Sequence, residues 1–103
     1  MLLDDYQREA KDTAIYPVSA HVIYPAMGLA NEAGEVLGKV KKMIRDGKLD
    51  REATLAEIGD VLWYVAVLAD DLNTNLSDIA NNNLQKLRSR QARGTLQGSG
   101  DNR

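Results

Sequence analysis

Two stretches of the sequence carry apolar residues at the spacing of an α-helix, and both are long enough to form one. On an ideal helix each residue turns by about 100°, so the apolar positions of each stretch merge into one stripe. The stripes consist of Leu29, Ala33, Val36, Leu37, Val40, Met43 and Ile44, and of Leu55, Ile58, Val61, Leu62, Val65, Leu68, Ala69 and Leu72. Because only a short connection at Asp46-Gly47 separates them, we expect an antiparallel pair of helices packed stripe to stripe.

Local start and stop signals predict two more helices and no strand, and hence an all-α, four-helix fold. Tyr16-Pro17 ends the first helix, since proline disfavours helix in the residue before it, and Pro25 suits the first turn of the second. Gly47 follows as a stop signal, while Asp50 and Ser77 are the expected N-caps of the last two helices. The predicted helices span roughly residues 3–14, 25–45, 51–73 and 77–91.

The length of 103 residues and the hydrophobic content of 44% suit one domain with a small core. We assign residues 1–93 to a single helical domain and residues 94–103 to a polar, glycine-rich tail, which composition alone would make extended and disordered. The third predicted helix also places Trp63 and Val67 away from its stripe. A helix that is apolar on most sides is usually central, so we expect a second copy of the chain to cover part of it.

Two acidic pairs lie at the margins of the stripes. Glu32 pairs with Glu35 and Glu57 with Asp60, and the i, i+3 spacing puts both members of a pair on one helix face. If the helices pack as expected, four carboxylates converge on one groove and repel one another unless a cation lies among them. Carboxylate oxygens suit Mg²⁺. Either pair alone is typical of a solvated helix face. Only because the two pairs occur together is a metal site as well supported as a solvated face.

Each acidic pair encloses a glycine, Gly34 in the first and Gly59 in the second. Glycine inside a helix costs roughly 1 kcal/mol relative to alanine. We therefore expect another backbone or a ligand to approach closely at both positions.

The fourth predicted helix carries a partly basic row beside its apolar stripe. Asn83, Lys86 and Arg90 form this row, and positive charge next to an acidic metal groove suits a polyphosphate ligand. Lys39 could also bind phosphate, although pairing with the acids of its own helix is the stronger interpretation. Trp63 is more typical of core or interface packing than of a platform for a base, and both interpretations remain open.

Composition argues against several other classes of function. The net charge of −2 disfavours a protein that coats nucleic acid. The lack of cysteine and the single His21 leave no thiolate or histidine cluster for zinc. No apolar run is long enough to span a bilayer and the acidic start differs from a signal peptide, so we expect a cytoplasmic protein without membrane contact.

These residues resemble the MazG-like family of nucleoside triphosphate pyrophosphohydrolases, in a compact, single-domain branch. The family motif, Glu-x-x-Glu and then Glu-x-x-Asp after a spacer, is matched without a gap by Glu32, Glu35, Glu57 and Asp60. The similarity extends to Tyr-Pro-Ala-Met-Gly-Leu-Ala-Asn-Glu-Ala-Gly-Glu-Val, to Glu-Ile-Gly-Asp-Val-Leu-Trp-Tyr and to the ending Arg-Gly-Thr-Leu-Gln-Gly-Ser-Gly-Asp-Asn-Arg. It therefore covers nearly the whole chain.

The resemblance implies an all-α bundle completed by a homodimer, or by a tetramer that is a dimer of dimers. It implies Mg²⁺-dependent hydrolysis of an NTP or dNTP between the α- and β-phosphates, with Mn²⁺ as a substitute metal. The four acids would be the metal ligands, and Glu35, or else Glu32, would orient or deprotonate the attacking water. The candidate contacts to phosphate and nucleotide are Lys86 and Arg90, together with Lys39, Asn83, Arg93, Trp63 and Arg103.

The favoured function is a house-cleaning enzyme that hydrolyses dNTPs or damaged nucleotides. A related pyrophosphohydrolase for phosphoribosyl-ATP or dUTP, and a non-catalytic helical dimerisation or regulatory module, are the alternatives. The tail offers successive backbone N–H groups at Gly98-Ser99-Gly100 and the charges of Arg93 and Arg103. We therefore expect it to fold over the bound nucleotide and help to close the site.

Overall fold

The computed structural model describes residues 1–103 and is all-α, with four α-helices and no strand, as the sequence predicts. The elements are α1 (Leu3–Asp12), a short 3₁₀ helix (Val18–Ala20), α2 (Ile23–Asp46), α3 (Arg51–Asp71) and α4 (Leu76–Ala92). None of these helices combines the length and the hydropathy that crossing a bilayer requires.

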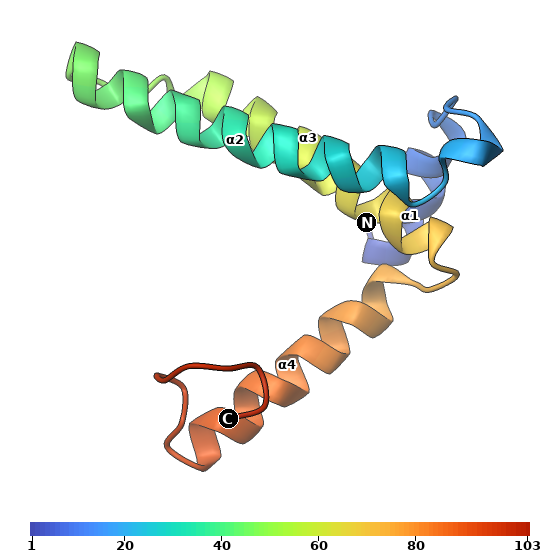
Figure 1. Cartoon of the computed structure of the whole chain (residues 1–103), viewed down its shortest axis with the longest axis vertical. Helices are drawn as coiled ribbons and strands as arrows, with labels where there is room; N and C mark the ends of the chain where they lie inside the picture. Colours follow the sequence, from blue (N-terminus) through green and yellow to red (C-terminus); the bar gives the residue numbers. More distant parts are fainter.

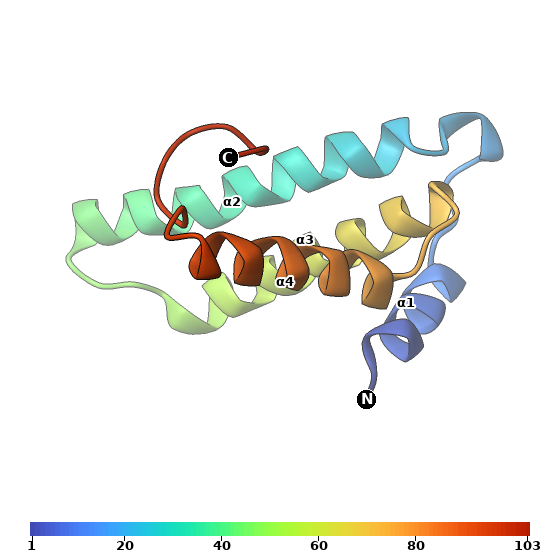
Figure 2. The ribbon, with the colours of Figure 1, turned by 90° about the horizontal axis from the view of Figure 1, so that it is seen from below.

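The two long central helices, α2 and α3, form an antiparallel hairpin, and both ribbon views show them side by side (Figures 1 and 2). Gly47 ends α2 in the left-handed conformation, with φ of 79°, and its N–H donates to the Met43 carbonyl at 2.7 Å. Asp50 caps α3 by accepting a hydrogen bond from the Ala53 N–H at 3.1 Å. The stop and start signals predicted at these residues are therefore confirmed.

The predicted cap of the fourth helix was wrong. Asn75 occupies the N-cap position of α4 and its side chain forms no capping bond, whereas Ser77 is already the second helical residue. The N–H and hydroxyl of Ser77 donate to the two carboxylate oxygens of Asp4, at 2.9 and 2.6 Å. In addition, the Leu76 N–H donates to Oε1 of Gln7 at 3.1 Å. The start of α4 is thus capped by side chains of α1, more than 65 residues earlier in the chain.

The hydrophobic core is small and lies where α1, the second half of α3 and the start of α4 meet. Only eight of the 103 residues are buried. One of them is Pro25 in α2, and the apolar core itself consists of Ala10, Ala66, Val67, Ala69 and Leu76. Figure 1 shows α4 running away from the hairpin, and α1 is its main packing partner.

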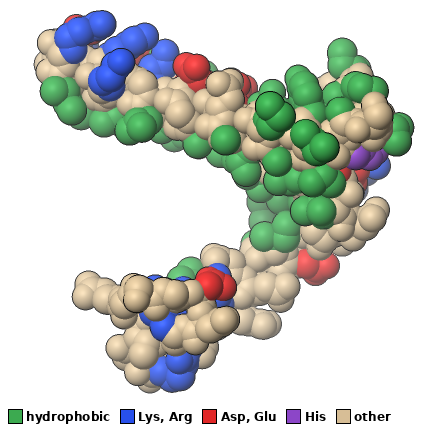
Figure 3. All heavy atoms as spheres, in the orientation of Figure 1, with side chains coloured by type: hydrophobic (Ala, Val, Ile, Leu, Met, Phe, Trp, Pro, Cys, Tyr) green, Lys and Arg blue, Asp and Glu red, His purple; other side chains and the backbone are tan.

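The stripes of α2 and α3 extend well beyond this core and are only partly covered within one chain. Leu37 is 69% exposed and Ile44 80%, and Leu55 and Leu72 are also exposed. Figure 3 shows apolar side chains along the concave side of the molecule, which opens between the hairpin and α4. The apolar pattern was therefore correct for the hairpin, but a large part of it has no partner in the same chain.

Candidate metal centre

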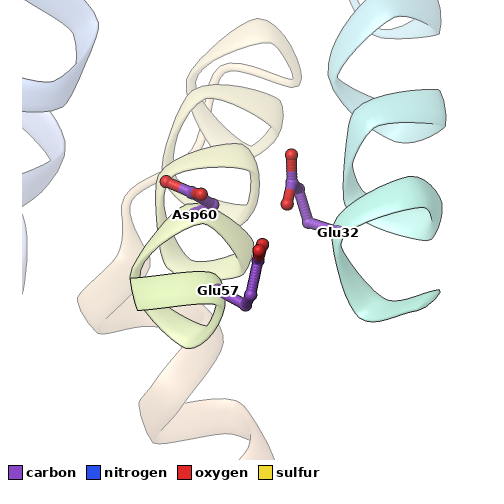
Figure 4. A group of neighbouring side chains, drawn as sticks. All are labelled: Glu32, Glu57 and Asp60. Carbon is purple, nitrogen blue, oxygen red and sulfur yellow. The ribbon is translucent and has the colours of Figure 1, made fainter. Parts of the chain in front are cut away.

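Three carboxylates meet between α2 and α3. Glu32 comes from α2, and Glu57 and Asp60 come from successive turns of α3. One carboxylate oxygen from each lies within 4.8 Å of the others. Figure 4 shows Glu32 and Glu57 directed toward each other across the hairpin, with Asp60 one turn along α3. The i, i+3 spacing on α3 and the antiparallel packing of α2 produce this arrangement.

The electrostatics of the centre are those of crowded like charges. A hydrogen bond shared with Glu57 is the largest of the effects that raise the pKa of Glu32 above its ordinary value. Partial burial and the negative charges of Asp60, Glu57 and Glu35 raise it further. A proton and a divalent cation offset the same repulsion, so carboxylates that share a proton are also suited to share a cation.

Glu35 stands apart from this group. It follows Glu32 by one turn of α2, its side chain is exposed, and it is not one of the three residues whose oxygens converge. Its charge acts on Glu32 only as the smallest of the contributions named above. The structure therefore gathers three of the four acids of the motif, and the roles predicted for Glu35 as ligand or base stay predictions.

No other part of the chain approaches the glycines that separate the acids, so the expected backbone contact was wrong within one chain, whereas the approach of a ligand stays a prediction. A Cβ built on Gly34 or on Gly59 would meet no atom of the chain within 4 Å. The close approach occurs instead at Gly28, where a Cβ would lie 2.1 Å from Cε1 of Tyr64. Gly28 is one turn before Glu32, so this contact sets the spacing of α2 and α3 beside the carboxylates.

Tyr64 and Tyr24 are neighbours of the centre that the sequence did not assign to it. Burial is the main effect that raises the pKa of Tyr64, followed by hydrogen bonding and charge from Tyr24 and then by the charges of Glu32 and Asp60. The rings of Tyr24 and Tyr64 have centroids 6.3 Å apart. The i+4 spacing of Asp60 and Tyr64 was a usable sequence signal, because it places both on one face of α3.

The basic row lies away from the acids within one chain, contrary to the expected acidic groove with a neighbouring basic row. Lys86 and Arg90 are on α4, which diverges from the hairpin (Figure 1), and both contact Asp101 of the tail. Asn83 is on the same helix and is exposed. The sequence analysis did not assign Asp101 to this group. The only feature that could have indicated it is that Asp101 is the one acidic residue of the tail.

The other candidate contacts are dispersed. Trp63 donates from Nε1 to the Thr13 hydroxyl at 2.8 Å and contacts Tyr64 edge-on, so it packs toward α1. Lys39 is partly buried on α2 and forms no ion pair with the acids of that helix. The one ion pair of α2 joins Arg45 and Asp46. Arg93 donates to the Ser89 hydroxyl at 3.1 Å. Their roles toward a nucleotide, and that of Arg103 in the tail, stay predictions.

An all-α hairpin that brings carboxylates together from facing helices defines a class of helical proteins with a centre suited to a divalent cation. Residues 25–94, which include all four acids, match the family model of the MazG nucleotide pyrophosphohydrolase domain. The chain belongs to this family, and the resemblance drawn from its motifs is confirmed.

One relative is similar to the chain over its full length. The "Gene 37 protein" of Mycobacterium phage L5 is 48% identical over 114 residues, an alignment that covers all of both chains. Its name states no activity. No solved structure matches the chain.

Proposed function

We propose that the chain is a Mg²⁺-dependent nucleoside triphosphate pyrophosphohydrolase that removes unwanted nucleotides from the cellular pool. The substrate would be an NTP or dNTP, and the products its monophosphate and pyrophosphate. The observation that carries the proposal is the convergence of Glu32, Glu57 and Asp60 within 4.8 Å in a chain of the MazG family.

The residues of the centre fit a hard divalent cation. All three offer carboxylate oxygens, which Mg²⁺ and Mn²⁺ prefer, and no sulfur or imidazole ligand is present among them. Glu32, Glu57 and Asp60 would hold the ion, with Glu35 as a further ligand from the next turn of α2. When bound, the ion supplies positive charge that neutralises phosphate oxygens during phosphoryl transfer.

Glu35 is our first candidate for the residue that activates water, with Glu32 as the alternative. A carboxylate there would accept a proton as the water oxygen bonds to phosphorus, while the bridge between the α- and β-phosphates breaks and pyrophosphate leaves. Glu35 suits this role because it is exposed and lies beside the three converging acids without belonging to them.

The open shape of the chain supports a homodimer, or a dimer of dimers, as the active form. With so few residues buried, the exposed stripes of α2 and α3 and the exposed Ile79, Leu84 and Leu87 of α4 need a partner, and a second copy offers matching stripes. The same association would bring Lys86 and Arg90 of one copy, and its tail, toward the acids of the other. These cations would then neutralise substrate phosphates and the tail would help to close the site.

A nucleotide panel tests the proposal. The common ribo- and deoxyribonucleoside triphosphates, oxidised and methylated derivatives, dUTP and phosphoribosyl-ATP would be incubated with Mg²⁺ or with EDTA, and pyrophosphate release measured. Release from at least one nucleotide, only with Mg²⁺, is expected. Turnover of phosphoribosyl-ATP or dUTP alone would replace the house-cleaning role with a specialised one. No release from any of them, with Mg²⁺ bound, would leave a non-catalytic helical module and overturn the proposal.

A further inference from the structure

The tail after α4 is a closed loop that Arg103 holds together. The Arg103 guanidinium donates to three tail carbonyls, those of Thr95 at 3.0 Å, Gly100 at 2.7 Å and Leu96 at 2.8 Å. Gly98 and Gly100 have φ of 136° and 86°, a region that other residues rarely adopt. The expectation of an extended tail from composition was therefore wrong, and Figure 1 shows the tail folded back along α4.

This loop places Asp101 on the basic row of α4. The Asp101 carboxylate accepts a hydrogen bond from Lys86 Nζ at 2.7 Å and one from Arg90 Nη2 at 3.2 Å. Arg90 Nη2 also donates to the Asp101 backbone carbonyl. The Arg90 side chain is only 6% exposed, so the tail covers it almost completely.

Asp101 satisfies Arg90 poorly. A guanidinium presents Nε and Nη donors as a fork that a carboxylate or a phosphate can engage with two oxygens. Here Asp101 accepts two hydrogen bonds from Nη2, one at its carboxylate and one at its backbone carbonyl, while Nε is buried and has no hydrogen-bond partner. A phosphate group has more acceptor oxygens and more negative charge than one carboxylate, so it can engage the free Nε as well as Lys86.

We propose that Asp101 is an internal competitor that occupies the anion-binding position formed by Lys86 and Arg90, and that a pyrophosphoryl group displaces it and releases the tail. The choice of a pyrophosphoryl ligand rests on the proposed function, in which such a group is part of both the substrate and the product. Binding of the pyrophosphoryl group to Lys86 and Arg90 would therefore detach residues 95–103 from α4. The tail could close over a nucleotide only after this detachment.

The test compares full-length wild type with Asp101→Asn, which removes the competing charge. Asp78→Asn is the matched control, because Asp78 is also exposed and on α4, its side chain forms no ion pair, and the change in net charge is the same. Calorimetry in EDTA gives the dissociation constant for inorganic pyrophosphate. If Asp101 leaves the Lys86–Arg90 position free for about one fifth of the time in the wild type, the dissociation constant for pyrophosphate falls by about fivefold in Asp101→Asn. The constant of the control stays near that of the wild type. Equal or weaker binding by Asp101→Asn would overturn the proposal.

Backbone nitrogen-15 relaxation gives a second, independent readout. Saturating pyrophosphate should lower the order parameters of residues 95–103 of the wild type, and order parameters that stay unchanged would contradict release. A parallel measurement uses a non-hydrolysable α,β-methylene nucleoside triphosphate, which stands for the substrate, whereas pyrophosphate is the product. The compound that releases the tail at the lower concentration identifies the source of the pyrophosphoryl group. Because EDTA prevents metal-dependent turnover, these measurements stand even if the chain proves unable to hydrolyse nucleotides.

Discussion

Tyr64 lies against Gly28 so closely that a Cβ on residue 28 would be 2.1 Å from the tyrosine ring. The contact is between α2 and α3 on the turn next to the carboxylates. Any side chain at residue 28 must therefore push the two helices apart or move the ring, and either response alters the metal centre.

Gly28→Ala is accordingly expected to lower the free energy of unfolding by about 1–3 kcal/mol, the usual cost of overpacking a tight contact. Gly34→Ala is the matched control, since it lies in the same helix with open space around its Cβ. It should raise stability by about 0.5–1 kcal/mol, because alanine is the better helix former. Urea denaturation in EDTA measures both. Equal effects of the two substitutions would contradict the assigned contact.

Gln7 is the second position with a sharp stability prediction. Its buried side-chain amide donates to the carbonyls of Ala66 and Thr74 and accepts from the Leu76 N–H, so it ties α1 to α3 and α4. Gln7→Leu leaves these buried groups unpaired and should cost about 3 kcal/mol. Gln85→Leu, at an exposed site on α4, should stay within about 0.5 kcal/mol of the wild type. A Gln7→Leu protein as stable as this control would refute the role of the amide.

Sequence-based prediction succeeded where the determinants are close together in the chain. Gly47 and Asp50 end and start helices through bonds that span three or four residues, and the acids of α2 and α3 meet because a short connection enforces an antiparallel hairpin. The capping of Ser77 by Asp4 and the contact of Asp101 with Arg90 depend on tertiary structure and carry no periodic signal. The direction of α4 could not be predicted either, since Ile79, Leu84 and Leu87 are left exposed within the chain.

The pKa of Glu32 predicts how stability without metal depends on pH. A raised pKa in the folded state stabilises the protein below the unfolded value, near 4.5, and this contribution is lost as pH rises through the folded value. The pKa values of Asp4 and Asp101 are lowered, by hydrogen bonds from Ser77 and from Lys86 respectively, so their contributions are lost only as pH falls below about 3.8. Urea midpoints in EDTA should therefore decline on raising pH above 4.5, and Glu32→Gln should remove most of that decline. An unchanged slope would argue against the carboxylate cluster.

Self-association should be evident in dilute solution. The exposed stripes of α2 and α3 predict at least a dimer at micromolar concentration, measured by sedimentation equilibrium. Ile44→Glu places a charge on a residue that is 80% exposed in one chain. It should weaken association, because the charge would be buried in the interface, while the helix content measured by circular dichroism stays unchanged. A wild-type chain that sediments as a folded monomer would contradict the dimer.

We propose that the carboxylates of α2 and α3, with Mg²⁺, hydrolyse a nucleoside triphosphate between its α- and β-phosphates. The most direct measurement is chromatographic quantification of all products formed from the best substrate by the wild type, Asp60→Asn, Glu35→Gln and the exposed control Glu9→Gln. The wild type and control should form monophosphate and pyrophosphate in equal amounts, only with Mg²⁺. Both site variants should lose activity by about a hundredfold or more while remaining folded. Release of a diphosphate and phosphate, or near-normal turnover by Asp60→Asn, would contradict the account.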